Sequence, residues 1–117
     1  MSLDPNCIFC KIIEKKIPAK ILHEDDRSLA FEDLNPQAPT HILIVPKHHI
    51  PDIHSITQTD RELIGHLFFV AQTLGEKLGL NKSGYRMVIN NGRAAGQTVF
   101  HIHLHLLSGR AFAWPPG

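Results

Sequence analysis

The sequence predicts an α+β domain built around an antiparallel sheet, and three observations support this class. The chain has 117 residues, of which 43% are hydrophobic and 20% charged, as in one ordinary globular domain. Short strand-like runs follow one another without regularly interposed helices, which favours an antiparallel sheet over a doubly wound one. The pattern also contains one long and one short amphipathic stretch. No linker or repeat divides the sequence, so we expect a single domain over residues 1–117.

A short helix is predicted near the N-terminus. Asp4 offers an N-cap and Pro5 a first helical residue, and apolar residues then recur at helical spacing. We expect this helix to end near Lys16, before Ile17-Pro18.

Three strands follow. Residues 20–24 and 28–32 predict a hairpin around the turn at residues 25–27. The continuous apolar run 41–45 predicts a strand buried on both faces, closed by Pro46.

The long helix is predicted at residues 57–80, with Thr57 or Thr59 as its cap and Gly79 near its end. Its apolar residues should face the sheet: Leu63, Ile64, Leu67, Phe68, Ala71, Leu74 and Leu78. Two last strands, at 85–89 and 99–107, flank a glycine-containing loop.

Composition excludes several classes of function. The net charge of +1 provides no large positive field for a nucleic-acid backbone. The apolar runs are far shorter than the roughly 20 residues of a membrane span, and the N-terminus lacks a signal-peptide pattern. We therefore expect a cytoplasmic protein that binds neither nucleic acid nor membranes.

Nine histidines stand out, and three of them alternate in the last predicted strand. His101, His103 and His105 should share one open face of that strand, while Ile102 and its alternating neighbours face the core. A neutral imidazole is a good nucleophile toward phosphorus, so this row predicts nucleophilic catalysis. Metal binding by one or two of the three remains an alternative, since the outer pair lies roughly 13 Å apart along a straight strand.

The loop before this strand carries groups suited to a phosphate. Gly96 permits close backbone approach, and Asn90, Gln97 and Thr98 bring amide and hydroxyl donors beside the histidines. Taken alone, the loop is more typical of an ordinary hairpin connection, but its position beside the three histidines favours the phosphate interpretation.

Cys7 and Cys10 form the only cysteine pair. In an intracellular chain this spacing favours metal binding over a structural disulfide, and a redox pair would normally follow a strand. Zinc would need two nitrogen ligands besides the thiolates. Simple packing of two small side chains stays an open alternative.

The segment from His101 to Leu107 resembles the signature of the histidine triad superfamily. Further segments resemble its Hint branch of nucleotide-binding phosphoramidases: 17–20, 29–33, 36–41, 84–88 and 114–117. The resemblance implies a five-stranded antiparallel sheet with one long and one short helix, continued across a homodimer in which the Trp114 region lies near the partner subunit. It also implies hydrolysis of purine nucleoside 5′-phosphoramidates, with AMP or GMP as the nucleotide.

Site roles follow from the same resemblance. His103 matches the nucleophile that forms a nucleotidyl-histidine, and His105 the residue that contacts the phosphate and assists the leaving amine. His101 and His49 match positions that orient the nucleophile. Asp33 matches the carboxylate that binds the ribose hydroxyls. The remaining predicted nucleotide contacts are Ile8, Phe9, Ile12, Phe31, Leu34, Asn90, Gly96, Gln97 and Thr98.

Many microbial members of the superfamily are similar in carrying a zinc site, which here implies Cys7, Cys10, His49 and His101 as ligands. The metal would be structural, and the chemistry itself would need no cofactor. The other histidines, His23, His41, His54 and His66, are predicted to be surface or structural residues.

Three positions depart from the pattern of the animal Hint proteins: Thr98 replaces Ser, Glu32 replaces a frequent His, and Ala113 replaces a polar residue. Two alternatives to a phosphoramidase remain. One is a regulatory module that binds AMP or GMP with incidental turnover. The other is a dinucleoside polyphosphate hydrolase, against which the C-terminal Trp-Pro-Pro-Gly argues.

Overall fold

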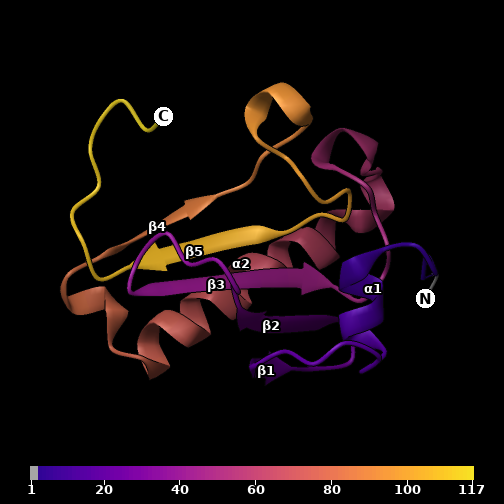
Figure 1. The fold of residues 1–117 in the computed structure, drawn as a ribbon, viewed down its shortest axis with the longest axis horizontal. Coiled ribbons are helices and arrows are strands. Elements are labelled where there is room, and N and C mark those ends of the chain that lie inside the picture. Colours follow the sequence, from indigo (N-terminus) through magenta and orange to yellow (C-terminus); the bar gives the residue numbers. More distant parts are fainter. Residues whose placement is uncertain (1–2) are drawn as a thin grey trace.

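A computed structural model describes residues 3–117, so the first two residues of the predicted domain lie outside the described part of the chain. Five antiparallel strands form one sheet in the order β1-β2-β3-β5-β4 (Figure 1). The elements are α1 (Ile8–Ile13), β1 (Ile21–Glu24), β2 (Ser28–Glu32), β3 (Thr40–Pro46), α2 (Arg61–Lys77), β4 (Tyr85–Val88) and β5 (Leu104–Ser108). The α+β class and the five-stranded sheet are confirmed.

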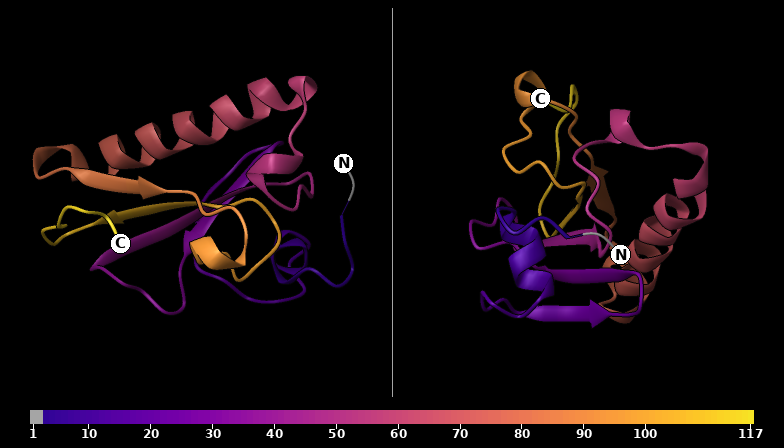
Figure 2. Two further views of the ribbon diagram at one scale, coloured as in Figure 1. Left: turned by 90° about the horizontal axis from the view of Figure 1, so that it is seen from above. Right: turned by 90° about the vertical axis from the view of Figure 1, so that its right-hand side faces the viewer.

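The two helices cover opposite faces of the sheet (Figure 2). On one face α2 packs its buried residues against side chains from the middle strands, among them Ile42, Ile44 and Leu104. On the other face α1 places Phe9 and Ile12 against a second buried cluster, which includes the alternate residues of β2 and β3. β3 contributes side chains to both clusters, so it is buried on both faces, as its continuous apolar run predicted.

The short helix begins later than predicted. Asp4 does not cap it, because its carboxylate accepts the backbone N–H of Asn6 at 2.9 Å and its carbonyl that of Cys7 at 3.1 Å, which closes a turn. Cys7 is the N-cap instead, and its Sγ accepts the N–H of Cys10. The helix ends before Lys15, whose positive φ of 65° stops it short of Lys16.

The long helix is shorter than predicted at both ends. A 3₁₀ turn, Gln58–Asp60, precedes α2, and Asp60 accepts the N–H of Thr57 at 2.8 Å. Gly79 in the left-handed conformation follows its end. Phe68 and Leu78, predicted to face the sheet, are 43% and 45% exposed, because the buried stripe is narrower and runs through Leu67, Val70, Ala71 and Leu74.

The last strand also begins later than predicted, at Leu104 and not at Val99. The N–H of Ile102 bonds to the carbonyl of Ile50 at 2.7 Å, outside the sheet's hydrogen-bond ladder. Ile102, Leu104 and Leu106 are buried as predicted, but the histidine face is not open: His101 is fully buried and His103 only 8% exposed. The reason is α1, which covers this part of the face with Phe9.

Within residues 3–117 no helix combines the length and apolar character needed to cross a bilayer.

Candidate active site

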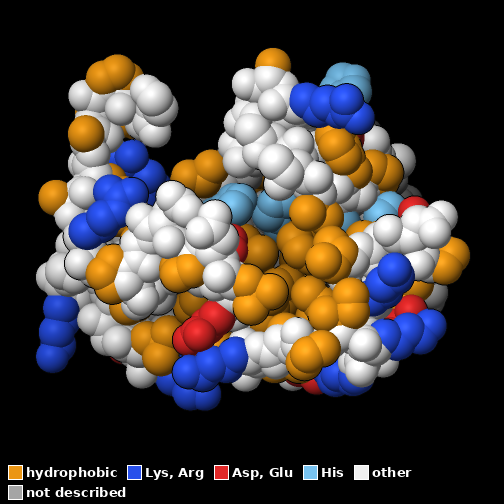
Figure 3. Space-filling model, in the orientation of Figure 1, with side chains coloured by type: hydrophobic (Ala, Val, Ile, Leu, Met, Phe, Trp, Pro, Cys, Tyr) orange, Lys and Arg blue, Asp and Glu red, His pale blue; other side chains and the backbone are white. Residues whose placement is uncertain are grey.

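A cavity of about 200 Å³ opens between α1 and the sheet, beside the histidines. Figure 3 looks onto this face and shows an apolar patch directly next to a row of histidine side chains. Most of the predicted nucleotide contacts line the cavity: Ile8, Phe9, Ile12, Phe31, Asp33, Leu34, Thr98, His103 and His105. Leu43, Val99, Glu32, Pro18 and Ala19 complete its wall.

The cavity has an apolar end and a polar end. At the apolar end Phe9 meets Phe31 edge to face, with ring centroids 5.6 Å apart. Phe9 also meets the ring of His103 edge to face at 5.1 Å. A flat aromatic group can therefore lie against α1 and β2 while a substituent reaches the histidines.

His103 is held in one tautomer by the backbone. Its Nδ1–H donates to the carbonyl oxygen of His101 at 2.8 Å, so its Nε2 keeps a free lone pair. Burial lowers the pKa of His103, which keeps the ring neutral at neutral pH. These are the properties of a nitrogen nucleophile.

His105 is held in the opposite tautomer through His41. The backbone N–H of Gln37 donates to His41 Nδ1 at 3.0 Å, so the proton of the neutral His41 ring is on Nε2. That Nε2–H donates to His105 Nδ1 at 2.9 Å. His105 must then carry its own proton on Nε2, where it can donate into the cavity.

His41 was predicted to be a surface or structural histidine, and it is a structural one: it is buried and contacts a triad histidine, a contact that the sequence did not indicate. The signal that could have shown this is its position. A polar ring at the start of a strand buried on both faces must find a partner inside the protein.

Asp33 lies at the polar end of the cavity. One carboxylate oxygen accepts the N–H of Asn35 at 2.8 Å, and the other lies 3.5 Å from His41 Nε2. Asp33, His41 and His105 also bring one ligand atom each within metal-binding range of one another. However, the N–H of Gln37 occupies the lone pair on His41 Nδ1, so the Nε2 of the neutral ring carries a proton and cannot bind a metal, and we interpret this group as a hydrogen-bonded relay.

Burial dominates the electrostatics of the histidines. It lowers the pKa of His105 to about 4, with smaller contributions from the neighbouring His103 and His41. It likewise lowers the pKa of His101 to about 4, while the hydrogen bond to Pro46 acts in the opposite direction. The site therefore presents neutral rings, each with a defined donor and acceptor.

The predicted phosphate loop divides into two parts. Thr98 lines the cavity, but Gln97 is buried and its amide bonds to the backbone at Gly92, Pro51 and Val99. Gln97 therefore holds the loop together, and its side-chain amide donates to backbone carbonyls and not toward the cavity. Gly96 adopts φ of 100°, and a Cβ there would lie 3.8 Å from Nδ2 of Asn90, so these two residues adjoin each other outside the cavity wall.

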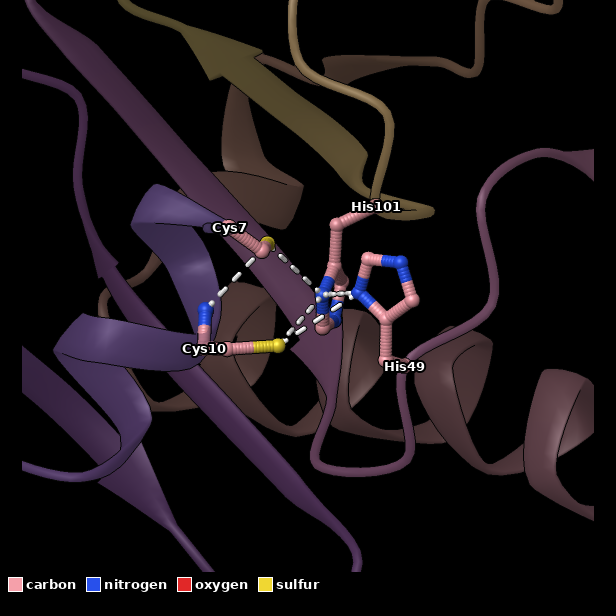
Figure 4. A group of neighbouring side chains, drawn as sticks. All are labelled: Cys7, Cys10, His49 and His101. Atoms are coloured by element: carbon pink, nitrogen blue, oxygen red, sulfur yellow. Dashed lines mark hydrogen bonds between the residues drawn. The ribbon is translucent and has the colours of Figure 1, made fainter. Parts of the chain in front are cut away.

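The four predicted zinc ligands come together in the structure. Cys7 and Cys10 of α1 face His49 and His101, and Figure 4 shows all four side chains converging. The Nδ1 of His101 lies 3.4 Å from Cys7 Sγ, 3.5 Å from Cys10 Sγ and 3.1 Å from His49 Nδ1. Ligand atoms on a tetrahedral zinc lie roughly 3.3–3.8 Å apart, given metal–ligand bonds of about 2.0–2.3 Å.

Hydrogen bonds prepare these side chains for a metal. The Nε2–H of His101 donates to the carbonyl of Pro46 at 2.8 Å, which leaves the lone pair on Nδ1, inside the cluster. His49 directs its Nε2 toward Asp4, 3.8 Å away. Burial raises the pKa of the Cys10 thiol to about 11. Without a cation nearby, this thiol therefore stays protonated at neutral pH and is not a reactive thiolate. The donor set fits zinc and argues against a redox pair.

His49 was also predicted, with His101, to orient and polarise the nucleophile. It contacts Cys10, His101 and Asp4, so it can act on His103 only through His101. Direct orientation comes from the carbonyl of His101, and His41 orients the other cavity histidine.

Comparisons with known proteins agree with this geometry. The family model described as the HIT domain matches residues 14–112. An uncharacterized HIT-like protein of Synechocystis is 53% identical over 94% of this chain and 96% of its own. A HIT family hydrolase of Legionella pneumophila shares 50% identity and superposes with a TM-score of 0.94, covering 96% of this chain and all of that one. A histidine triad nucleotide-binding protein of Candida albicans is 35% identical with a TM-score of 0.82, over 96% of this chain and 85% of that one. The chain therefore belongs to the HIT family.

Proposed function

We propose that the protein hydrolyses the P–N bond of purine nucleoside 5′-phosphoramidates, as in the Hint branch of the family. The observation that carries this proposal is the pair of opposite tautomers at one cavity. His103 presents an acceptor nitrogen and His105 a donor nitrogen, both beside an apolar slot. Two relatives support the proposal: the Legionella protein is a HIT family hydrolase, and the Candida protein is a histidine triad nucleotide-binding protein.

The nucleoside would occupy the cavity from its apolar end. The purine lies among Ile8, Phe9 and Phe31, where an aromatic ring removes apolar surface from water. Asp33 accepts hydrogen bonds from the ribose hydroxyls, using the carboxylate lone pairs that the N–H of Asn35 leaves free. The α-phosphate then reaches His103, with Thr98 at the edge of the cavity.

The reaction would proceed in two displacements. The Nε2 lone pair of His103 attacks phosphorus, and the P–N bond breaks with its electron pair on nitrogen, which takes a proton from water. His105 stays neutral and donates Nε2–H to the phosphoryl group or the departing nitrogen. Water then attacks phosphorus and gives up a proton to solvent, and the bond between phosphorus and His103 Nε2 breaks with its electron pair returning to Nε2, which releases the nucleoside monophosphate. The His101 carbonyl accepts Nδ1–H throughout, which stabilises the charge that develops on His103.

The test is turnover of adenosine 5′-phosphoramidate by the wild type, His103→Ala and His54→Ala. His54 is an exposed histidine and serves as the matched control. We expect AMP release by the wild type and the control, and a loss of at least about 1,000-fold in His103→Ala. AMP binding without turnover in the wild type would instead favour the regulatory module. Faster cleavage of diadenosine polyphosphates would favour the dinucleoside polyphosphate hydrolase.

Zinc belongs to the proposal as a structural ion. Cys7, Cys10, His49 and His101 would hold it, and it would brace α1 against the segment that carries His103. The bound ion would supply structural cross-linking, and His103 remains free for the chemistry. A folded Cys7→Ser protein with unchanged thermal stability but lower turnover would contradict this division.

We also propose a homodimer in the cytoplasm. β4 is an edge strand of the sheet, and Met87 on it is 38% exposed. Trp114 in the C-terminal segment is 82% exposed, which is unusual for so large an aromatic side chain and fits a place near the partner subunit.

A further inference from the structure

Asp4, in the turn before α1, contacts three of the four proposed zinc ligands. Its backbone N–H donates to Cys10 Sγ at 3.3 Å, and its carbonyl accepts the N–H of Cys7 at 3.1 Å. One of its carboxylate oxygens, Oδ2, lies 3.8 Å from Nε2 of His49. One residue of the N-terminal turn is therefore linked to both cysteines and to one of the two histidines.

The two histidines of the cluster are arranged alike. Each presents Nδ1 to the cluster, where the two Nδ1 atoms lie 3.1 Å apart. The outward Nε2 of His101 donates to the carbonyl of Pro46 at 2.8 Å, and the outward Nε2 of His49 faces Asp4. Figure 4 shows this second nitrogen of His49 on the side of the ring away from the cysteines. An outer partner of this kind fixes the orientation and tautomer of a metal-bound histidine and makes its lone pair more basic.

His49 is the histidine that depends more on such a partner. His101 is fully buried, whereas the side chain of His49 is 17% exposed. His49 and Cys7 line an open cavity of about 290 Å³ between the N-terminal turn and residues 98–100, and Asp4 forms part of its wall. A partly exposed ring has room to rotate, so a group outside the cluster is needed to keep its Nδ1 directed inward.

The carboxylate of Asp4 is itself held in place. Its Oδ1 accepts the N–H of Asn6 at 2.9 Å, which closes a tight turn and leaves Oδ2 on the side of His49. Asp4 is not among the four side chains whose ligand atoms lie within 4.8 Å of one another. It therefore acts around the metal cluster and not as one of its ligands.

We propose that Asp4 is a positioning residue of the zinc site, which holds His49 in the orientation that binds the metal and slows zinc release through the adjoining cavity. This inference rests on the zinc site of the proposed function. A zinc ion withdraws electron density from a bound imidazole, so the outer N–H of His49 becomes a stronger donor to the carboxylate. Asp4 does not line the nucleotide cavity and takes no part in the attack on phosphorus.

Asp4→Asn tests the proposal. The amide keeps a side-chain oxygen for the N–H of Asn6 and leaves both backbone contacts intact, but it removes the negative charge beside His49. We expect zinc affinity, measured by competition with a chromophoric chelator, to fall by about tenfold or more, as for loss of an outer partner. Most of this loss should be faster zinc dissociation. The matched control is Asp26→Asn, which removes the same charge from an exposed turn and should keep the wild-type affinity.

A merely structural role of Asp4 would also change the metal-free protein. We therefore expect metal-free Asp4→Asn and metal-free wild type to have the same Tm, and zinc to raise the Tm less in the variant. The absorption spectrum of bound Co²⁺ should stay tetrahedral in both proteins, because the four ligands are unchanged.

Three results would overturn the inference. The first is an equal zinc affinity and dissociation rate in Asp4→Asn and wild type. The second is an equal loss of affinity in Asp26→Asn, which would show that net charge alone is responsible. The third is a lower Tm of the metal-free Asp4→Asn protein with an unchanged rise on adding zinc, which would limit Asp4 to a role in the turn.

Failure of the proposed function has a different signature. The zinc content of the wild type and its turnover of adenosine 5′-phosphoramidate are measured in parallel. A zinc-bound wild type with an unaffected Asp4→Asn variant removes the inference and keeps the zinc site. A wild type that binds no zinc removes both, and turnover alone then decides the phosphoramidase. A loss of zinc affinity in Asp4→Asn, without turnover in the wild type, removes the phosphoramidase and keeps the role of Asp4.

Discussion

Backbone groups decide what each triad histidine can do. The carbonyl of His101 holds the proton of His103 on Nδ1, the carbonyl of Pro46 holds that of His101 on Nε2, and the N–H of Gln37 acts on His105 through His41. In the proposed function, three chemically identical side chains thereby serve as a nucleophile, a metal ligand and a hydrogen-bond donor. The division of labour comes from the fold around the rings.

The pH dependence of turnover should reflect burial at His105. Its pKa is lowered to about 4, so the neutral ring persists well below the ordinary value of 6.5. We expect the acid limb of kcat, followed by AMP release, to lie below 6.5, because burial lowers the pKa of both His103 and His105. A limb centred near 6.5 would contradict the burial argument. The stability of the fold should depend on pH in the same direction. Because the folded state favours the neutral ring of His105, the resulting stabilisation is complete above about pH 6.5 and is lost as the pH falls toward 4.

The sequence could predict which histidines gather at the cavity and the cysteine cluster, but not every partner that they contact. Alternation along residues 101–106 gave the correct faces, since it depends only on strand geometry. Gln97 was assigned differently from what the structure shows, and the contact of His41 with His105 was not predicted, because both depend on residues distant in sequence: Gln97 bonds to the Pro51 carbonyl and His41 to His105. No local pattern records such contacts.

At the scale of elements, α1 serves two sites at once. Cys7 and Cys10 face the proposed metal cluster, while Ile8 and Phe9 between them line the nucleotide cavity. A helix of six residues is too short to be stable alone, so its position depends on what it packs against.

Zinc and nucleotide binding should therefore be coupled. Chelation of the metal is expected to weaken AMP affinity by roughly fivefold or more, and AMP should strengthen zinc binding by the same factor. Calorimetric titration of AMP with and without zinc measures the effect, and Cys10→Ser should mimic chelation. Lys11→Ala, on the same helix but outside the cluster, is the control and should keep the zinc-bound affinity. Equal AMP affinities in both metal states would show that α1 holds its position unaided.

The β1–β2 turn is tied to α2 by the partly exposed carboxylate of Asp25. Asp25 accepts hydrogen bonds from His23 at 2.8 Å, from His66 of α2 at 2.7 Å and from the hydroxyl of Ser28 at 2.9 Å. Burial opposes its ionisation, but the bonds from His23, the Arg27 N–H and the others outweigh burial and hold its pKa far below the usual range. The ionised carboxylate stabilises the fold fully above about pH 3.8, and this stabilisation is lost as the pH falls below that value.

Replacing this carboxylate should cost stability without touching the cavity. We expect Asp25→Asn to lower the free energy of unfolding by about 2 kcal/mol, because several donors lose a charged acceptor. Urea denaturation at pH 7 measures the change. Asp26→Asn, at the exposed neighbouring position, should stay within about 0.5 kcal/mol of wild type. Equal midpoints for the two variants would contradict the role of Asp25.

For the whole molecule, one sheet separates two buried clusters with different uses. The α2 side is a closed apolar core, whereas the α1 side contains the nucleotide cavity, the triad and the cysteines. The strand pattern predicted this sheet because each run had a clear period and clear turns. It could not predict the irregular path at residues 99–103, where Ile102 bonds to the Ile50 carbonyl from outside the sheet.

The proposed dimer belongs to this scale. If the sheet continues across β4, Met87→Glu should shift the equilibrium toward monomer, because it places a charge at the joining edge. Sedimentation equilibrium compares it with the wild type and with Asp26→Lys, which alters charge at the turn by the opposite edge strand, β1. A wild-type monomer would refute the dimer, and a Met87→Glu dimer would move the interface away from β4.

The spacing of α1 has a consequence for how this protein can change over evolution. Only Ile8 and Phe9 lie between the two cysteines, and each added residue would rotate a helix by about 100°. An insertion here would turn one thiol away from His49 and His101 and would displace the cavity wall at the same time. In the proposed nucleotide site, base preference can therefore change by substitution at these two positions. The number of residues between the two cysteines, however, cannot change without loss of both sites.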